Sequence, residues 1–249
     1  MRFDPEKETE KISNFIKTTL EKTGKSKVVL GISGGIDSAT SFYLLKNSIP
    51  LKNIILAHLY YFEPLNLDSL TNGIPQENVY FISIKEIVDA MANQLKIDSA
   101  IDKIRFGNIA ARVRMIILYD LAKRYGAIVS GTENKSENLL GYFTRFGDEA
   151  SDIEPIKNLY KTQVYQLAKY LKIPQEIINQ PPSAGLWKGQ TDEDELGFTY
   201  READQVLYLY FEEKQSLEEI KNKGFKNAEK ILERVSKNEY KHSAPYSIS

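Results

Sequence analysis

The side chains best suited to ligand binding or catalysis lie in SGGIDS, residues 33–38, two residues after the apolar run 28–30. Adjacent glycines let a backbone turn tightly and approach a ligand, and free N–H groups at the start of a following helix favour an anion. Asp37 adds a carboxylate that a bound polyphosphate would repel unless a hard dication such as Mg²⁺ lay between them. The stretch therefore predicts a phosphate-binding loop that holds Mg²⁺ through Asp37. The predicted loop comprises Gly31, Ile32, Ser33, Gly34, Gly35, Ile36, Asp37 and Ser38.

Two better-known glycine motifs do not fit this loop. No Gly-Lys-Ser or Gly-Lys-Thr follows it, which excludes a Walker A loop, and the G-x-G-x-x-G spacing of dinucleotide-binding loops does not match. The alternative interpretation is an ordinary tight turn in which Asp37 only caps the next helix. Two serines and an aspartate between a strand and a helix favour the phosphate loop, because the hydroxyls can donate to phosphate oxygens.

The elements around the loop must place it at the edge of a sheet. Apolar runs predict strands at 27–32, 53–60, 79–84 and 127–129, and helical spacing predicts helices at 36–46, 85–95, 107–125 and 162–171. Asp4-Pro5 and Gly24 bound an N-terminal helix, and a helical tail with a capping box at Ser216 and Glu219 begins at Tyr200. This alternation predicts an α/β fold with a doubly wound, mostly parallel sheet flanked by helices, in a single domain over residues 1–249.

Composition narrows the classes of protein that fit. The net charge is −1 at pH 7, so there is no basic excess for a long polyanion such as a nucleic acid. The chain has no cysteine, which excludes disulfides, zinc–thiolate sites and a cysteine nucleophile, and His58 and His242 are its only histidines. We see no signal peptide and no apolar run long enough for a membrane span, so we expect a cytoplasmic protein.

Further stretches carry a resemblance to a known family. SGGIDS is similar to the pyrophosphatase loop of the N-type ATP pyrophosphatases, which cleave ATP to AMP and pyrophosphate to adenylate a substrate oxygen. Four later stretches, read in order, resemble ammonia-dependent NAD synthetases: GNIAARVRMIILYDLA (107–122), GTENKSENLLGYFTRFGD (131–148), DIEPIKNLYKTQV (152–164) and PPSAGLWKGQTDEDELGFTY (181–200). The resemblance implies a Rossmann-like fold of the adenine nucleotide alpha hydrolase type. It implies a carbon–nitrogen ligase that makes NAD, AMP and diphosphate from deamido-NAD, ATP and ammonia, as a homodimer with Mg²⁺.

The resemblance also assigns roles to single residues. It implies that Asp37 and Glu137 bind Mg²⁺, and that Asp37 and Lys161 are catalytic. The positions implied for ATP, besides the loop, are Thr132, Lys161 and Ser183; those implied for deamido-NAD are Arg112, Arg145, Asp152, Tyr240 and Lys241. Simpler readings stay open for four of them: a solvated acid for Glu137, a surface charge for Lys161, a helix cap for Ser183 and a structural ion pair for Arg112.

The sequence departs from the family pattern in two places. At the C-terminus a frequent His-Lys pair is replaced by Tyr240-Lys241, with His242 one position later. Relatives often carry a segment with Gln and Asp between residues 60 and 78, and YYFEPLNLDSLTNGIPQ stands there instead, so the resemblance assigns no adenine contacts to this segment. Residues 183–197 are expected to form a lid that excludes water from the adenylate, with a plain surface loop as the alternative.

Two other functions are compatible with a phosphate loop of this kind. One is a tRNA-modifying adenylating enzyme, although sulfur insertion commonly uses cysteine and tRNA binding needs a basic surface. The other is a nucleotide-binding sensor that does no chemistry, which would not need both Asp37 and Glu137. A glutamine-using enzyme would need a hydrolytic nucleophile, usually cysteine, so we expect free ammonia as the nitrogen source. Apolar residues of the C-terminal helices are expected in the core or in a dimer contact: Leu207, Tyr208, Leu209 and Phe211.

Overall fold

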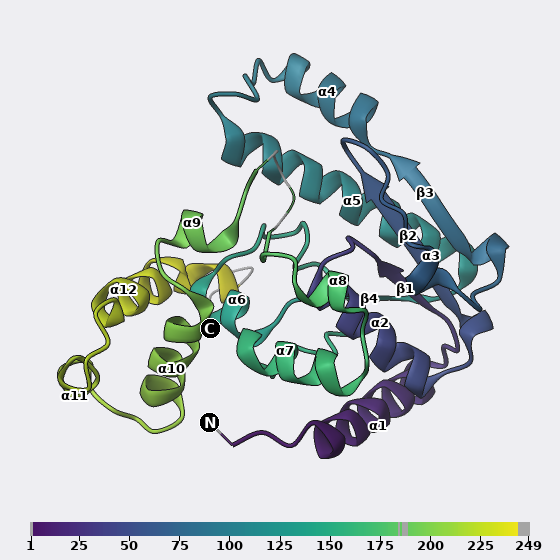
Figure 1. Ribbon diagram of the computed structural model, residues 1–249. Helices are drawn as coiled ribbons and strands as arrows, with labels where there is room; N and C mark the ends of the chain where they lie inside the picture. The colour runs from purple at the N-terminus through teal and green to yellow at the C-terminus, as the bar shows by residue number, and fades with distance from the viewer. Residues whose placement is uncertain (1, 184, 186–188, 244–249) are drawn as a thin grey trace, which may run out of the picture.

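A four-stranded parallel sheet forms the centre of the computed structural model, which describes residues 2–183, 185 and 189–243. The strands lie in the order β3-β2-β1-β4 (Figure 1). Their bounds are Val28–Gly31 for β1, Ile54–Tyr60 for β2, Val79–Ser83 for β3 and Ile128–Ser130 for β4. Val28 at the start of β1 pairs with both Ile54 and Ile128. All four predicted strands are therefore confirmed, with boundaries shifted by one residue.

Helices cover both faces of the sheet because side chains alternate along each strand. Val28 and Leu30 of β1 pack on one side, and Val29 packs on the other. The first side is covered by α1 (Pro5–Thr23), α2 (Ile36–Ser48) and α7 (Lys161–Tyr170), and the second by α4 (Lys85–Gln94) and α5 (Lys103–Tyr125) (Figure 1). This arrangement confirms the doubly wound α/β class.

The C-terminal helices form a third apolar cluster beside the sheet. They are α10 (Tyr200–Phe211), α11 (Leu217–Asn222) and α12 (Ala228–Asn238), and of these α10 and α12 contact α6 (Lys135–Leu140) (Figure 1). Leu207 is fully buried here, and Tyr208, Leu209 and Phe211 pack against the cluster. Of the two interpretations of these four side chains, the structure selects core packing.

Local capping signals fix several helix ends. Asp4 caps α1, Pro5 opens it and Gly24 ends it, as predicted, and the capping box of Ser216 and Glu219 starts α11. One predicted boundary was wrong, because α5 begins four residues earlier than position 107, and α6 was not among the predicted helices. Asn134 and Glu137 form a capping box there, a spacing that the sequence interpretation overlooked.

The remaining elements are short. They are α3 (Asp68–Thr71), α8 (Gln175–Ile178), α9 (Asp192–Leu196) and 3₁₀ turns at Leu51–Asn53, Gln76–Asn78 and Glu239–His242. Within the described ranges, no helix combines the length and apolarity of a membrane span. The strand order changes direction between β1 and β4, so the carboxyl ends of these two strands flank the crevice where doubly wound sheets bind ligands.

Candidate active site

The glycine loop connects the carboxyl end of β1 to the first turn of α2. Gly34 has φ of 86°, a left-handed conformation that favours glycine, and Gly35 is the N-cap of α2. The two serines bind within the loop: Ser33 N donates to Ser38 Oγ at 3.2 Å, and Ser38 Oγ donates to the Gly35 carbonyl at 3.0 Å. These contacts fix the shape of the loop, and the start of α2 faces the end of the sheet.

Three predicted residues from three elements meet at the end of this loop. Lys161 Nζ lies 2.6 Å from Asp37 Oδ2 and 2.8 Å from Glu137 Oε1. The lysine side chain is only 2% exposed, and the carboxylates are 18% and 16% exposed. Asn134 adds a fourth contact by donating from Nδ2 to Asp37 Oδ1 at 2.9 Å. The structure thus brings the predicted metal ligands and the predicted catalytic lysine into one cluster.

The charges of this cluster depend on one another. Burial disfavours the ammonium of Lys161, but the facing carboxylates outweigh it and hold the pKa of Lys161 above its ordinary value. Burial also raises the pKa of Glu137, and Lys161 only partly opposes this because its single charge is shared with Asp37. The Tyr200 ring covers the ammonium, with its centroid 5.1 Å from Nζ. The lysine is therefore a fixed, charged part of the site and not a surface residue.

A second set of contacts places the helices that carry Glu137 and Lys161. Asp204 of α10 is fully buried, and its carboxylate accepts from Ser136 Oγ and, at 2.7 Å, from Thr162 N. Lys161 N donates to Ser136 Oγ at 2.8 Å. Asp204 therefore satisfies the free N-terminus of α7 and ties it to α6. No local pattern in the sequence pointed to Asp204, because an acid in a helix usually lies on the surface.

Three of the five predicted substrate residues surround the turn that follows α6. Arg112 Nη2 donates to the Arg145 carbonyl at 3.1 Å, and Arg145 Nη2 donates to the Ser243 carbonyl at 2.9 Å. Lys241 Nζ donates to the carbonyls of Gly141 at 2.6 Å and Phe143 at 3.0 Å. Burial lowers the pKa of Lys241. Arg112 is exposed, and its guanidinium contacts the Arg145 carbonyl and no carboxylate among the described residues, so a structural ion pair finds no support.

The other predicted residues occupy separate surroundings. Asp152 accepts from Val129 N at 2.7 Å, which ties it to β4, and Tyr240 is largely exposed. Thr132 follows β4 at the same edge of the sheet as the glycine loop, and Ser183 is exposed, with its Oγ accepting from Gly185 N. Positions 184 and 186–188 of the predicted lid lie outside the described residues, and its C-terminal part is α9, capped by Thr191.

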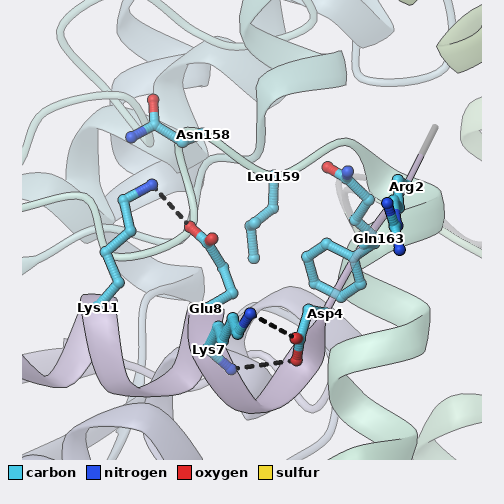
Figure 2. A pocket seen from close by; sticks show the side chains of 9 residues that line it. Arg2, Asp4, Lys7, Glu8, Lys11, Asn158, Leu159 and Gln163 are labelled. Atoms are coloured by element: carbon cyan, nitrogen blue, oxygen red, sulfur yellow. Dashed lines mark hydrogen bonds and ion pairs between the residues drawn. The ribbon is translucent and has the colours of Figure 1, made fainter.

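Two hollows formed by described residues lie away from the lysine cluster. Figure 2 shows a pocket of about 320 Å³ between the start of α1 and residues 158–163, in which Lys7 pairs with Asp4 and Lys11 with Glu8. A second hollow of about 420 Å³ shares Asn158 with the first and is lined by Asp152 and Glu154. Asp152 is the predicted site residue that reaches one of these hollows.

Comparison with known proteins shows the family of this chain. A family model described as NAD synthase matches residues 8–245. The chain belongs to the NAD synthase family. The NH(3)-dependent NAD(+) synthetase of Fusobacterium nucleatum is 43% identical over 235 residues, which cover 93% of this chain and 91% of that protein. These matches favour the NAD synthetase interpretation over a tRNA-modifying enzyme or a sensor.

Two solved structures have the same fold as this chain. The NMN synthetase of Francisella tularensis matches with a TM-score of 0.84 and 33% identity, covering 100% of both chains. The NH3-dependent NAD synthetase of Campylobacter jejuni, in complex with a nitrate ion, matches with a TM-score of 0.81 and 30% identity, covering 99% of this chain and 100% of that one. The likeness covers the whole chain, the C-terminal helices included.

Proposed function

We propose that the cluster of Asp37, Lys161 and Glu137 is the pyrophosphate site of an ATP-dependent amidation: deamido-NAD and ammonia give NAD, with AMP and diphosphate as the other products. The observation that supports this most strongly is the position of the Lys161 ammonium within 3 Å of both acids, 2.6 and 2.8 Å, at the strand ends where this fold binds ligands. A single domain over residues 1–249 is also part of the proposal, because α10 in the C-terminal region holds α6 and α7, which carry Glu137 and Lys161.

The chemistry needs activation of a carboxylate. The nicotinate anion repels a nucleophile and has no leaving group, so transfer of AMP from ATP to its oxygen must come first. The glycine loop, residues 31–38, offers backbone N–H groups and the start of α2 to the phosphates. Lys161 then stabilises the negative charge of the departing diphosphate.

Asp37 and Glu137 are the residues that would hold Mg²⁺. Their donor set fits this ion, because two carboxylates with phosphate oxygens and water complete the usual oxygen shell. Among the described residues no group of three or more acid or histidine side chains is arranged for a metal, so further ligands would come from ATP. When bound, the ion would neutralise the phosphates and assist the loss of diphosphate.

Arg112, Arg145 and Lys241 form the proposed rim for deamido-NAD. All three are cationic donors, and guanidinium groups suit a carboxylate or a diphosphate. Arg145 Nε is buried without a hydrogen-bond partner among the described residues, which leaves a donor for a ligand. Thr132, Ser183, Asp152 and Tyr240 keep the ATP and substrate roles implied by the resemblance as parts of this proposal.

A homodimer is also part of the proposal. We place its contact surface on other elements than the C-terminal helices. Those helices use their apolar side chains within the subunit. Exposed apolar side chains lie instead on α4 and α5, where Ile87, Met91, Ile104 and Ile116 face outwards. Such a surface is typical of subunit contacts. Sedimentation should give a dimer, and a fully active monomer would contradict it. The cytoplasmic location expected from the sequence also stays a proposal.

The test is a product assay with purified protein, ATP and Mg²⁺. We expect diphosphate and NAD in equal amounts when deamido-NAD and an ammonium salt are both added. Glutamine freed of ammonia should give almost no NAD. Because one structural neighbour is an NMN synthetase, nicotinate mononucleotide is run beside deamido-NAD; a strong preference for the mononucleotide would replace the proposed substrate. Diphosphate formation without any amide product would contradict the proposal.

A further inference from the structure

The segment that departs from the family pattern lies over the glycine loop. A Cβ added at Gly34 would lie 2.7 Å from Leu65 Cδ1 and 3.8 Å from Leu67 Cδ2. Leu65 is 46% exposed, whereas Leu67 is buried. Since β2 and β1 are neighbours in the sheet, the chain that leaves β2 reaches the end of β1 within a few residues. Residues 61–67 thus form an edge of the phosphate loop and present an apolar side chain beside it.

His58 connects this segment to the loop. Its ring is buried in β2, with Nδ1 2.8 Å from the Ile32 carbonyl and Nε2 accepting from Leu65 N at 3.1 Å. A carbonyl can only accept, so Nδ1 carries the proton, and Nε2 must be free of one to accept from a backbone N–H. The contacts therefore specify a neutral imidazole that spans the two segments. The Tyr60 and Phe81 rings flank it at 5.7 and 5.8 Å between centroids.

We propose that His58 is a positioning residue for ATP: it holds residues 61–67 on the glycine loop through Ile32 and Leu65, so that nucleotide affinity depends on this bridge. The proposal rests on the proposed function in taking ATP as the ligand of the loop. The Ile32 carbonyl directly precedes Ser33, and Leu65 covers Gly34, so both ends of the bridge contact the residues that would surround the phosphates. Loss of one hydrogen bond to His58 would release the segment without removing any residue that touches the phosphates.

Two substitutions separate the ends of the bridge. His58→Asn keeps a donor where Nδ1 lies but cannot reach Leu65, whereas His58→Gln places an acceptor where Nε2 lies. We would measure binding of α,β-methylene-ATP with Mg²⁺ by calorimetry, in the absence of deamido-NAD. His58→Asn should weaken binding by about 5- to 10-fold, the effect of one lost hydrogen bond. His58→Gln keeps the contact to Leu65 but loses the one to the Ile32 carbonyl, so it should weaken binding by a similar factor.

Phe81→Leu is the matched control, because it alters the packing of the same imidazole and removes neither hydrogen bond. It should leave the affinity within about 2-fold. Leu65→Ala, at an exposed position, gives an independent variant if the His58 variants do not fold; it should weaken binding by about 3-fold or more. The double variant His58→Asn with Leu65→Ala should be no weaker than His58→Asn alone, because both act through one segment.

Steady-state rates give a second readout. With His58→Asn the KM for ATP should rise by about the same factor as the dissociation constant, while kcat at saturating ATP changes less than about 3-fold. Unchanged ATP affinity in His58→Asn or Leu65→Ala, or an equal loss in Phe81→Leu, would overturn the proposal. A wild-type protein that binds ATP but makes no amide from deamido-NAD would instead overturn the proposed function.

Discussion

Two pairs of acids lie near the end of β4, and their surroundings differ. Asp37 and Glu137 share the ammonium of Lys161, whose side chain is 2% exposed. Glu133 and Glu154 lie next to each other through the Glu133 N–H, which donates to Glu154 Oε2 at 3.1 Å. Their nearest cation is Lys157, which is 45% exposed and 3.5 Å from Glu133 Oε2. Lys157 and Lys161 are four residues apart in the chain, yet only the second is enclosed.

The difference follows from the local fold. Lys161 opens α7, whose N-terminus is fixed by Ser136 and Asp204, so its side chain is directed between two acids. Lys157 lies on an exposed turn and reaches Glu133 from outside. Burial then dominates the second pair: it raises the pKa of Glu133 to about 7 and that of Glu154 to about 8. The first pair therefore shares an enclosed cation, whereas the second pair has only a half-exposed cation to oppose the effect of burial.

Replacing Lys161 should have the largest effect. Lys161→Met leaves two acids facing each other without a cation, so we expect the free energy of unfolding to fall by about 3 kcal/mol. Turnover should fall about 100-fold or more, since a group that stabilises the leaving diphosphate is lost. Urea denaturation and initial rates measure the two effects. Lys161→Arg keeps the charge and should recover more stability than turnover; wild-type turnover in Lys161→Met would show that the lysine is structural only.

The second pair predicts a pH dependence of stability. Unfolded glutamates lose their protons by about pH 5, whereas the folded acids keep theirs until about pH 7 and 8, so the folded state binds more protons in this window. The free energy of unfolding should therefore decrease, by about 6 kcal/mol, as pH rises from about 5 to 8. In the double variant Glu133→Gln with Glu154→Gln this decrease should become much smaller, and the rest comes from other buried acids such as Glu137, whose pKa is also raised by burial.

A control for that measurement is Glu218→Gln, because the Glu218 side chain is 77% exposed and its replacement should leave the pH curve unchanged. If the double variant and the wild type had parallel stability curves from pH 5 to 8, the two acids would be ionised throughout and the contrast between the pairs would be wrong.

Replacing Lys157 should have the smallest effect. Its ion pair with Glu133 is long and half-exposed, so Lys157→Met should change the free energy of unfolding by about 1 kcal/mol or less. Turnover should stay within about 3-fold of the wild type. A loss as large as that of Lys161→Met would mean that exposure does not distinguish the two lysines. Denaturation of both variants under one set of conditions makes the comparison.

The sequence predicted the fold class and the central site because both leave local signals. Alternating apolar segments specify the sheet, and SGGIDS combines turn, anion and metal chemistry within six residues. The cluster itself could be predicted only through resemblance, since Asp37 and Lys161 are 124 residues apart. Pattern alone does not say which distant side chains meet.

Residues whose roles depend on buried contacts with distant partners were not predicted. Asp204 and His58 owe their roles to partners far along the chain, and neither stands in a motif. The capping role of Asn134 could have been predicted, because its spacing to Glu137 is that of a capping box. The same box would have predicted α6. The apolar residues of the C-terminal helices stayed open between the core and a dimer contact, because composition does not show which of them face the subunit's own core.

The most direct test of the account is the dependence of NAD formation on Mg²⁺ in three variants. Asp37→Asn and Glu137→Gln should each lose most turnover, about 100-fold, at limiting Mg²⁺, and should need more Mg²⁺ for half-maximal rate. Glu133→Gln, from the second pair, should keep the Mg²⁺ dependence of the wild type. If Asp37→Asn or Glu137→Gln kept near-wild-type turnover at limiting Mg²⁺, the cluster around Lys161 would not be the metal and diphosphate site.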